Sequence, residues 1–141
     1  MVAMLGHTEI KGKKIDDLVK EGAISREKLN EIVDRTKKGG AEIVKYLEKG
    51  SAYYAPAASG VEMAESYLKD LKKKLPCDVY LNGEYGARDI YAGVPVIIGS
   101  DCVEKIIQLN LSDSEKINFE NSIKSVKTLF DAAKNIDKSL I

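Results

Sequence analysis

The period of the apolar residues changes near residue 77, and this change limits the folds open to the chain more than any other feature. Before it, apolar side chains recur three and four residues apart, as on the buried face of a helix. The segment CDVYL, residues 77–81, instead alternates and is rich in β-branched and aromatic residues, as strands are. Helical periodicity returns after residue 112. Helices followed by strands and a last helix predict an α+β fold.

Three helical stretches precede the strands. The first begins at Ile15, and the second opens with Ser25 as its N-cap. Gly39–Gly40 interrupts the apolar stripe of the second stretch, which predicts a kink or the close approach of another backbone. The third begins within the small-residue segment 50–60, with Pro56 in its first turn, where the missing N–H is not needed. Its expected buried stripe consists of Val61, Ala64, Leu68 and Leu71.

Three strands are expected after Pro76, over residues 77–81, 90–99 and 102–111. The connections between them are short, which favours an antiparallel arrangement. Ser112 and Glu115 form a capping box that opens the last helix. The apolar face of that helix is expected to be buried through Phe119, Ile123, Val126, Phe130 and Ala133. The chain therefore predicts long helices packed on a mainly antiparallel sheet of about three strands.

Composition limits the possible functions without naming one. The chain of 141 residues has 22 basic and 22 acidic side chains, and this balance argues against nucleic acid as a partner. It has no apolar run long enough to span a membrane, and its first residues lack the pattern of a signal peptide. Cys77 and Cys102 are interpreted as small core residues in a reducing compartment, so we expect a cytoplasmic protein.

The residues alone offer little catalytic machinery. The sequence contains no Walker motif, no GxGxxG and no Cys/His cluster, so no metal site is expected. His7 is the only histidine, and Glu9 stands two residues after it. The pair could act as a general base with an orienting carboxylate, or His7 could be a surface residue near a chain end.

The most unusual stretch is GSAYYAPAASG, residues 50–60. Small side chains before a helix either let two helices pack closely or leave room for a ligand beside the helix. Under the packing interpretation, Tyr53 and Tyr54 are core or interface aromatics.

The same stretch carries a resemblance to a known family. DRTKKGGAEIVKYLEKGSAYYAPAASGVEMAESYLKD, LPCDVYLNGEYGARDIYAGVPVIIG and VEKIIQLNLSDSEK resemble the carboxy-terminal, substrate-binding domain of the NAD-dependent malate dehydrogenases, specifically the lactate-dehydrogenase-like bacterial type. The similarity covers nearly all of residues 15–137 without gaps.

The resemblance implies a two-domain enzyme that transfers a hydride between NAD and C2 of malate or oxaloacetate. The Rossmann half, the catalytic histidine with its aspartate, and the substrate-binding arginines of the family lie outside this chain, so no catalytic residue is assigned here. Ser51 and Ala52 fall on positions beside the C2 and C3 substituents of the substrate, and Pro56 falls where a side chain meets the nicotinamide. Ala52 stands where lactate enzymes carry threonine, which favours malate.

Spacing within the family places His7 away from the catalytic position. Asp17–Leu18 follows His7 by ten residues, whereas the corresponding pair in the family lies about twice as far from the catalytic histidine. We therefore expect that His7 is not the base and that the chain begins at the cut edge of a larger enzyme. An alignment with His7 as the base would require a deletion that removes a strand. Residues 1–14, with Lys11, Lys13 and Lys14, are expected to be a divergent edge, and residues 15–141 the domain itself.

Two hypotheses follow. The chain is either the substrate half of a malate dehydrogenase, inactive alone and unable to bind NAD tightly, or a non-catalytic domain that is autonomous, oligomerising or a truncated remnant. The expected partners are malate or oxaloacetate, the missing Rossmann domain and further copies of the chain, associated through helix faces.

Overall fold

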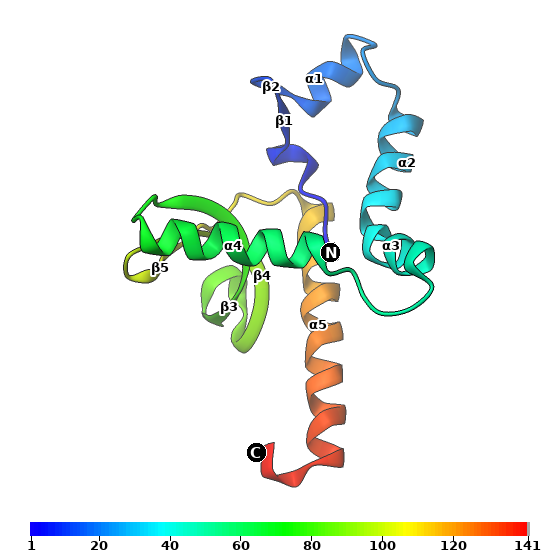
Figure 1. Ribbon diagram of the computed structural model, residues 1–141. Coiled ribbons are helices and arrows are strands. Elements are labelled where there is room, and N and C mark those ends of the chain that lie inside the picture. Colours follow the sequence, from blue (N-terminus) through cyan, green and yellow to red (C-terminus); the bar gives the residue numbers. More distant parts are fainter. Residues whose placement is uncertain (141) are drawn as a thin grey trace. The chain divides into compact units, whose positions relative to one another are not determined.

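The computed structural model describes residues 1–140 (Figure 1). The chain divides into two compact units, one of residues 3–59 with Met1 and one from residue 60 onward with Val2. The division falls inside helix α4 (Tyr54–Leu68). Each unit is described by itself.

The first unit is mostly helical. Residues 1–14 form the short 3₁₀ turn η1 (Leu5–His7) and a small antiparallel hairpin of β1 (Glu9–Ile10) and β2 (Lys13–Lys14). Three helices follow: α1 (Ile15–Lys20), α2 (Arg26–Lys37) and α3 (Gly39–Leu47). The only buried apolar side chains of this unit, among the described residues, are Ile15 and Leu29.

The predicted cap and kink of the second helical stretch are both confirmed. The Ser25 hydroxyl accepts a hydrogen bond from the Lys28 backbone N–H at 3.1 Å, which caps α2. Lys38, with φ −97° and ψ 1°, then separates α2 from α3, so the helix breaks immediately before Gly39. The break therefore falls at Lys38, and Gly39 and Gly40 are the first two residues of α3.

The second unit contains an antiparallel sheet of three strands in the order β3–β4–β5, as the sequence predicts. The strands are β3 (Lys73–Asn82), β4 (Arg88–Gly99) and β5 (Cys102–Ile106), with the 3₁₀ turn η2 (Glu84–Gly86) between the first two. β3 begins at Lys73 rather than after Pro76, and Pro76 pairs with Pro95. Proline is compatible with β3 because this strand lies at the edge of the sheet.

One face of this sheet makes most of the core. Alternate side chains of β3 and β4 are buried, and Leu81 and Val96 have no exposed surface at all. The other buried apolar residues of the two strands are Cys77, Val79, Ala92, Val94 and Ile98. The interpretation of both cysteines as core residues is wrong for Cys102, which is exposed at the first position of β5.

Helix α5 (Asp113–Ile136) begins with the predicted capping box, in which the Ser112 and Glu115 side chains each bond the other's backbone N–H. Phe119 is buried and its ring lies 5.1 Å from that of Tyr85. The prediction that one face is buried through Phe130 to near the C-terminus is wrong, because Phe130 is 47% exposed. α5 contacts β4 near its beginning, and its later turns extend past the sheet (Figure 1).

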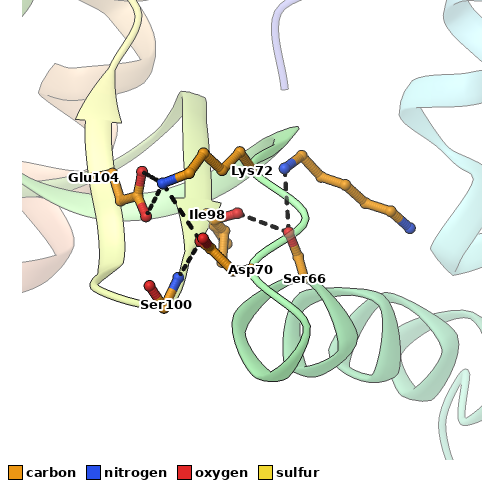
Figure 2. A network of polar contacts seen from close by, with 7 residues as sticks. Ser66, Asp70, Lys72, Ile98, Ser100 and Glu104 are labelled. Carbon is orange, nitrogen blue, oxygen red and sulfur yellow. Dashed lines mark hydrogen bonds and ion pairs between the residues drawn. The ribbon is translucent and has the colours of Figure 1, made fainter.

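The expected buried stripe of α4 is also wrong in this structure. Val61 is 67% and Leu68 78% exposed, while the one fully buried residue of the helix is Ser66. The Ser66 hydroxyl donates to the Ile98 carbonyl at 2.7 Å and accepts from the Lys73 N–H at 3.2 Å (Figure 2). A polar residue, not an apolar stripe, thus joins the end of α4 to the sheet.

Ion pairs extend this junction around the β4–β5 turn. Asp70 accepts the Ser100 backbone N–H at 2.9 Å, and the Lys72 ammonium bonds both Glu104 oxygens at 2.9 and 2.8 Å (Figure 2). The Ser100 N–H and the Lys72 ammonium keep the pKa of the Asp70 carboxyl below its usual value, and the Glu104 carboxylate raises the pKa of Lys72. We call Ser66, Asp70, Lys72, Ser100 and Glu104 the polar clasp.

Candidate functional site

The residues that the sequence singles out for ligand contact lie in one short segment of the first unit. Ser51 and Ala52 belong to the connection between α3 and α4, where Ser51 is exposed and Ala52 half-buried. Pro56 is the third residue of α4 and is exposed. The segment therefore presents small side chains on an accessible surface.

The connection before these residues is tightly wound. Glu48 has a positive φ of 59°, and the Lys49 N–H bonds the Leu47 carbonyl at 2.6 Å. Gly50 follows with φ +91°, in a region that residues with a side chain rarely adopt. Two positive φ angles within three residues turn the chain sharply out of α3, so Ser51 and Ala52 follow directly from this turn.

Pro56 occupies a position that suits its missing N–H, as predicted. The first hydrogen bond of α4 runs from the Ala57 N–H to the Tyr53 carbonyl at 3.0 Å, so the three N–H positions before Ala57 need no partner within the helix. The first turn carries no acidic side chain. The site offers a hydroxyl, a half-buried methyl group and a proline ring, which can contact and orient a ligand but cannot exchange protons near neutral pH.

An arginine bridge beside the kink was not found by sequence reasoning. Arg35 on α2 donates two hydrogen bonds, at 3.1 and 2.8 Å, to the two carboxylate oxygens of Glu42 on α3. These bonds raise the pKa of the Arg35 guanidinium and lower the pKa of the Glu42 carboxyl. An arginine and a glutamate on either side of a Gly–Gly pair were the available signal, and the bridge spans the break before α3.

A shallow groove runs along the same two helices. It is lined by Ile32, Arg35, Thr36, Gly39, Glu42, Ile43 and Tyr46. Glu42 already occupies the guanidinium of Arg35, so the polar part of this groove is satisfied within the protein. It therefore adds no second chemical site to the one before α4.

His7 lies in η1 on the surface of the first unit, and Glu9 begins the hairpin strand that pairs with Lys14. The backbone N–H of His7 donates to the Met4 carbonyl at 3.1 Å. The expectation that His7 is not the catalytic base stays a prediction, as do the roles assigned to Ser51, Ala52 and Pro56.

Residues 1–140 contain no group of three or more His, Cys, Asp or Glu side chains placed to hold a metal ion. No helix in this part of the chain is long and apolar enough to cross a membrane.

Comparison with known proteins identifies the family to which this fold belongs. The family model of the lactate/malate dehydrogenase, alpha/beta C-terminal domain matches residues 1–137. The chain is 64% identical over 140 residues to the malate dehydrogenase of Pelagibacter ubique (strain HTCC1062), covering 99% of this chain and 44% of that protein.

Two crystal structures are similar as well. Cryptosporidium parvum malate dehydrogenase superposes with a TM-score of 0.87 and is 45% identical, covering 90% of this chain and 40% of that one. Eimeria maxima lactate dehydrogenase with NADH and oxamate gives a TM-score of 0.92 at 41% identity, covering 96% of this chain and 42% of the other.

The chain belongs to the lactate/malate dehydrogenase family, of which it is the α/β carboxy-terminal domain. It spans less than half the length of the relatives it matches, and the nucleotide-binding half of the family is not among the described residues. The family match begins at residue 1, while the division between residues 1–14 and 15–141 stays a prediction.

Proposed function

We propose that the chain is the substrate-binding half of an NAD-dependent malate dehydrogenase, which converts malate and oxaloacetate into each other by hydride transfer. The observation that carries this proposal is the 64% identity to a malate dehydrogenase, which extends across the segment before α4. Ala52 supports malate over lactate, because the lactate enzymes of the family typically carry threonine at that position.

In this proposal, Ser51 and Ala52 form the wall beside C2 and C3 of the substrate, and Pro56 lies against the nicotinamide. Hydride transfer needs the reacting atoms about 3–3.5 Å apart, so residues behind them must be small. The exposed proline ring and the uncharged start of α4 fit a flat nicotinamide ring. When bound, NAD supplies or accepts the hydride, while the residues of this chain hold and orient the substrate.

The isolated chain is proposed to be inactive and to bind NAD only weakly. Ser51, Ala52 and Pro56 have no titratable group that could serve as the base. A dinucleotide also needs a far larger surface than the start of one helix. Activity therefore requires a Rossmann half that brings the base, the arginines and most of the nucleotide site. A cytoplasmic location and self-association stay part of this proposal.

Complementation tests the proposal. The chain is mixed with the amino-terminal part of the Pelagibacter ubique relative, and NADH absorbance is followed with oxaloacetate or pyruvate as substrate. We expect no turnover by either half alone, turnover by the mixture, and a preference for oxaloacetate. Absence of turnover at every ratio of the two halves would overturn the split-enzyme proposal, and a preference for pyruvate would overturn the substrate assignment.

A second candidate function is that of a non-catalytic, self-associating domain. It is favoured by the exposed apolar side chains on the helices, among them Leu129 (72%) and Ile136 (88%) on α5. Sedimentation of the chain without any added half separates the candidates. A stable oligomer that gives no turnover with the Rossmann half supports the second, and a monomer that is activated by that half supports the first.

A further inference from the structure

Gly50 and Tyr53 are in contact across the two residues that the proposed function places beside the substrate. The three heavy atoms nearest to a Cβ built on Gly50 all belong to the Tyr53 side chain. Cζ and Cε2 of the ring would lie 3.1 and 3.2 Å from that Cβ, and the hydroxyl oxygen still closer. The ring therefore occupies the space that any side chain at position 50 would need.

Two independent features of Gly50 make this contact possible. Its φ of +91° is available to glycine and strained for other residues. Its missing side chain leaves room for the Tyr53 ring to approach the backbone. A substitution at position 50 would therefore be opposed by both the backbone conformation and the ring.

The contact closes a small loop. Gly50 and Tyr53 flank Ser51 and Ala52, so a ring held against Gly50 limits the conformations of the two residues between them. The Tyr53 carbonyl also accepts the first backbone hydrogen bond of α4, from the Ala57 N–H. This bond fixes the Tyr53 backbone at the start of the helix. The Tyr53 ring thus connects the start of α4 to Gly50, in the turn that follows α3.

We propose that Tyr53 is a positioning residue for the substrate wall, acting through its ring on Gly50 and so on Ser51 and Ala52. This inference rests on the proposed function. The hydroxyl oxygen is the nearest atom and two ring carbons also lie against Gly50, so we expect the ring edge to keep the contact when the oxygen is removed. The side chain is 61% exposed, so packing in the core does not account for its place.

Steady-state kinetics of the complemented enzyme test the inference, with oxaloacetate and NADH varied separately. Misplacing reacting groups by about 1 Å can cost about 100-fold. We expect Tyr53→Ala and Gly50→Ala to lower kcat/KM for oxaloacetate by about 10- to 100-fold while leaving KM for NADH unchanged. Tyr53→Phe should retain the wild-type values. A general loss of folded protein would instead lower kcat for every substrate without changing either KM.

Matched controls come from the same chain. Tyr91→Ala removes a ring of similar exposure, 65%, from the outer face of the sheet. Gly60→Ala adds a methyl group where nothing lies within 4 Å. Both should behave as wild type. If Tyr53→Ala also retains the wild-type kcat/KM, or if Tyr53→Phe loses as much as Tyr53→Ala, the positioning role is wrong.

A spectroscopic measurement separates this inference from the proposed function. Because an aromatic ring shifts the resonances of protons beside it, the Gly50 α-protons should be displaced from their usual position in NMR spectra of the chain alone. The displacement should persist in Tyr53→Phe and vanish in Tyr53→Ala. Wild-type complementation without turnover overturns the proposed function even if the displacement is present. Wild-type turnover without any displacement of the Gly50 resonances overturns the positioning inference alone.

Discussion

The sheet of the second unit and the helices of the first differ sharply in how much of themselves they bury. The sheet, the segment after it and the start of α5 contribute nine buried apolar side chains, from Cys77 to Phe119, whereas the described residues of the first unit contribute two, Ile15 and Leu29. α3 has no buried residue at all. Apolar burial is the main stabilising term in folding. The core of the second unit should therefore stabilise that unit far more than the core of the first unit stabilises the first.

The stable core and the candidate site therefore lie in different units of the chain. The sheet forms a core of its own, and the polar clasp ties its β4–β5 turn to the end of α4 (Figure 2). The helical unit instead carries the segment of Ser51, Ala52 and Pro56 on elements with little core beneath them. A candidate site on weakly buried elements agrees with the proposal that a second half completes it.

The largest loss of stability is expected from Leu81→Ala, compared with the same substitution at Leu47. Leu81→Ala removes a fully buried side chain of β3 and should lower the free energy of unfolding by about 2–5 kcal/mol. Leu47→Ala, at a residue of α3 that is 43% exposed, should cost about 1 kcal/mol or less. Urea unfolding followed by circular dichroism measures both. Equal losses would show that α3 is packed as firmly as the sheet and that the two units do not differ in stability.

A second test concerns two serines of α4. Ser66→Ala leaves the Ile98 carbonyl and the Lys73 N–H without their buried partner and should cost about 1–3 kcal/mol. Ser59→Ala removes an exposed hydroxyl that bonds only the Ala55 carbonyl of its own helix, and should change stability by about 0.5 kcal/mol at most. The same urea titration compares them. A neutral Ser66→Ala would mean that the polar clasp does not hold α4 to the sheet.

Removing a helix cap should change stability less than the substitutions above, and each unit has one such cap. Ser112→Ala breaks the capping box of α5 and should lower the unfolding free energy by about 1 kcal/mol. Ser25→Ala removes the cap of α2, which buries only Leu29, and should act mainly as local fraying. Hydrogen exchange detects this fraying in the first turn of α2. The contrast fails if Ser25→Ala shifts the global urea midpoint as much as Ser112→Ala does.

The smallest effect concerns pH. Because the pKa of Asp70 is lowered in the folded chain, its carboxylate stabilises the fold above its ordinary pKa near 3.8. This stabilisation is lost as the pH falls through the lowered value. Asp70→Asn should therefore reduce stability at neutral pH, and the difference from wild type should shrink as the solution becomes acid. Thermal unfolding at a series of pH values measures it.

Ser66→Ala provides the control for that pH series, because serine does not titrate and its effect should not depend on the charge of Asp70. A constant difference between Asp70→Asn and wild type from neutral to acid pH would show that the carboxylate is not stabilised by Ser100 and Lys72 in solution.

The local elements of this chain were predictable because their signals are local. Ser25 and Ser112 cap helices, the glycines at 39 and 40 mark a break, and residues 77–81 alternate, all within a few residues of the feature they specify. The boundaries were less predictable. β3 begins at Lys73, since pairing with β4 extends the strand through Pro76, and no local signal announces that pairing.

The burial of the helices was predicted wrongly for a physical reason. Periodicity shows which side chains of α4 and α5 share a face, but not whether anything covers that face. Val61, Leu68 and Phe130 are exposed in this chain although the pattern reads as a buried stripe. The apolar pattern therefore predicts a helix face, and only the structure decides whether that face is covered.

The sequence by itself determined the order of helices and strands, the caps, the kink and the family, because each depends on residue types and their spacing along the chain. Only the tertiary structure decided that Ser66 holds α4 to the sheet, that Asp70 and Lys72 reach the β4–β5 turn, and that the Tyr53 ring lies on Gly50. These contacts depend on where the backbone brings side chains together in space, and the spacing of residues along a chain does not record that.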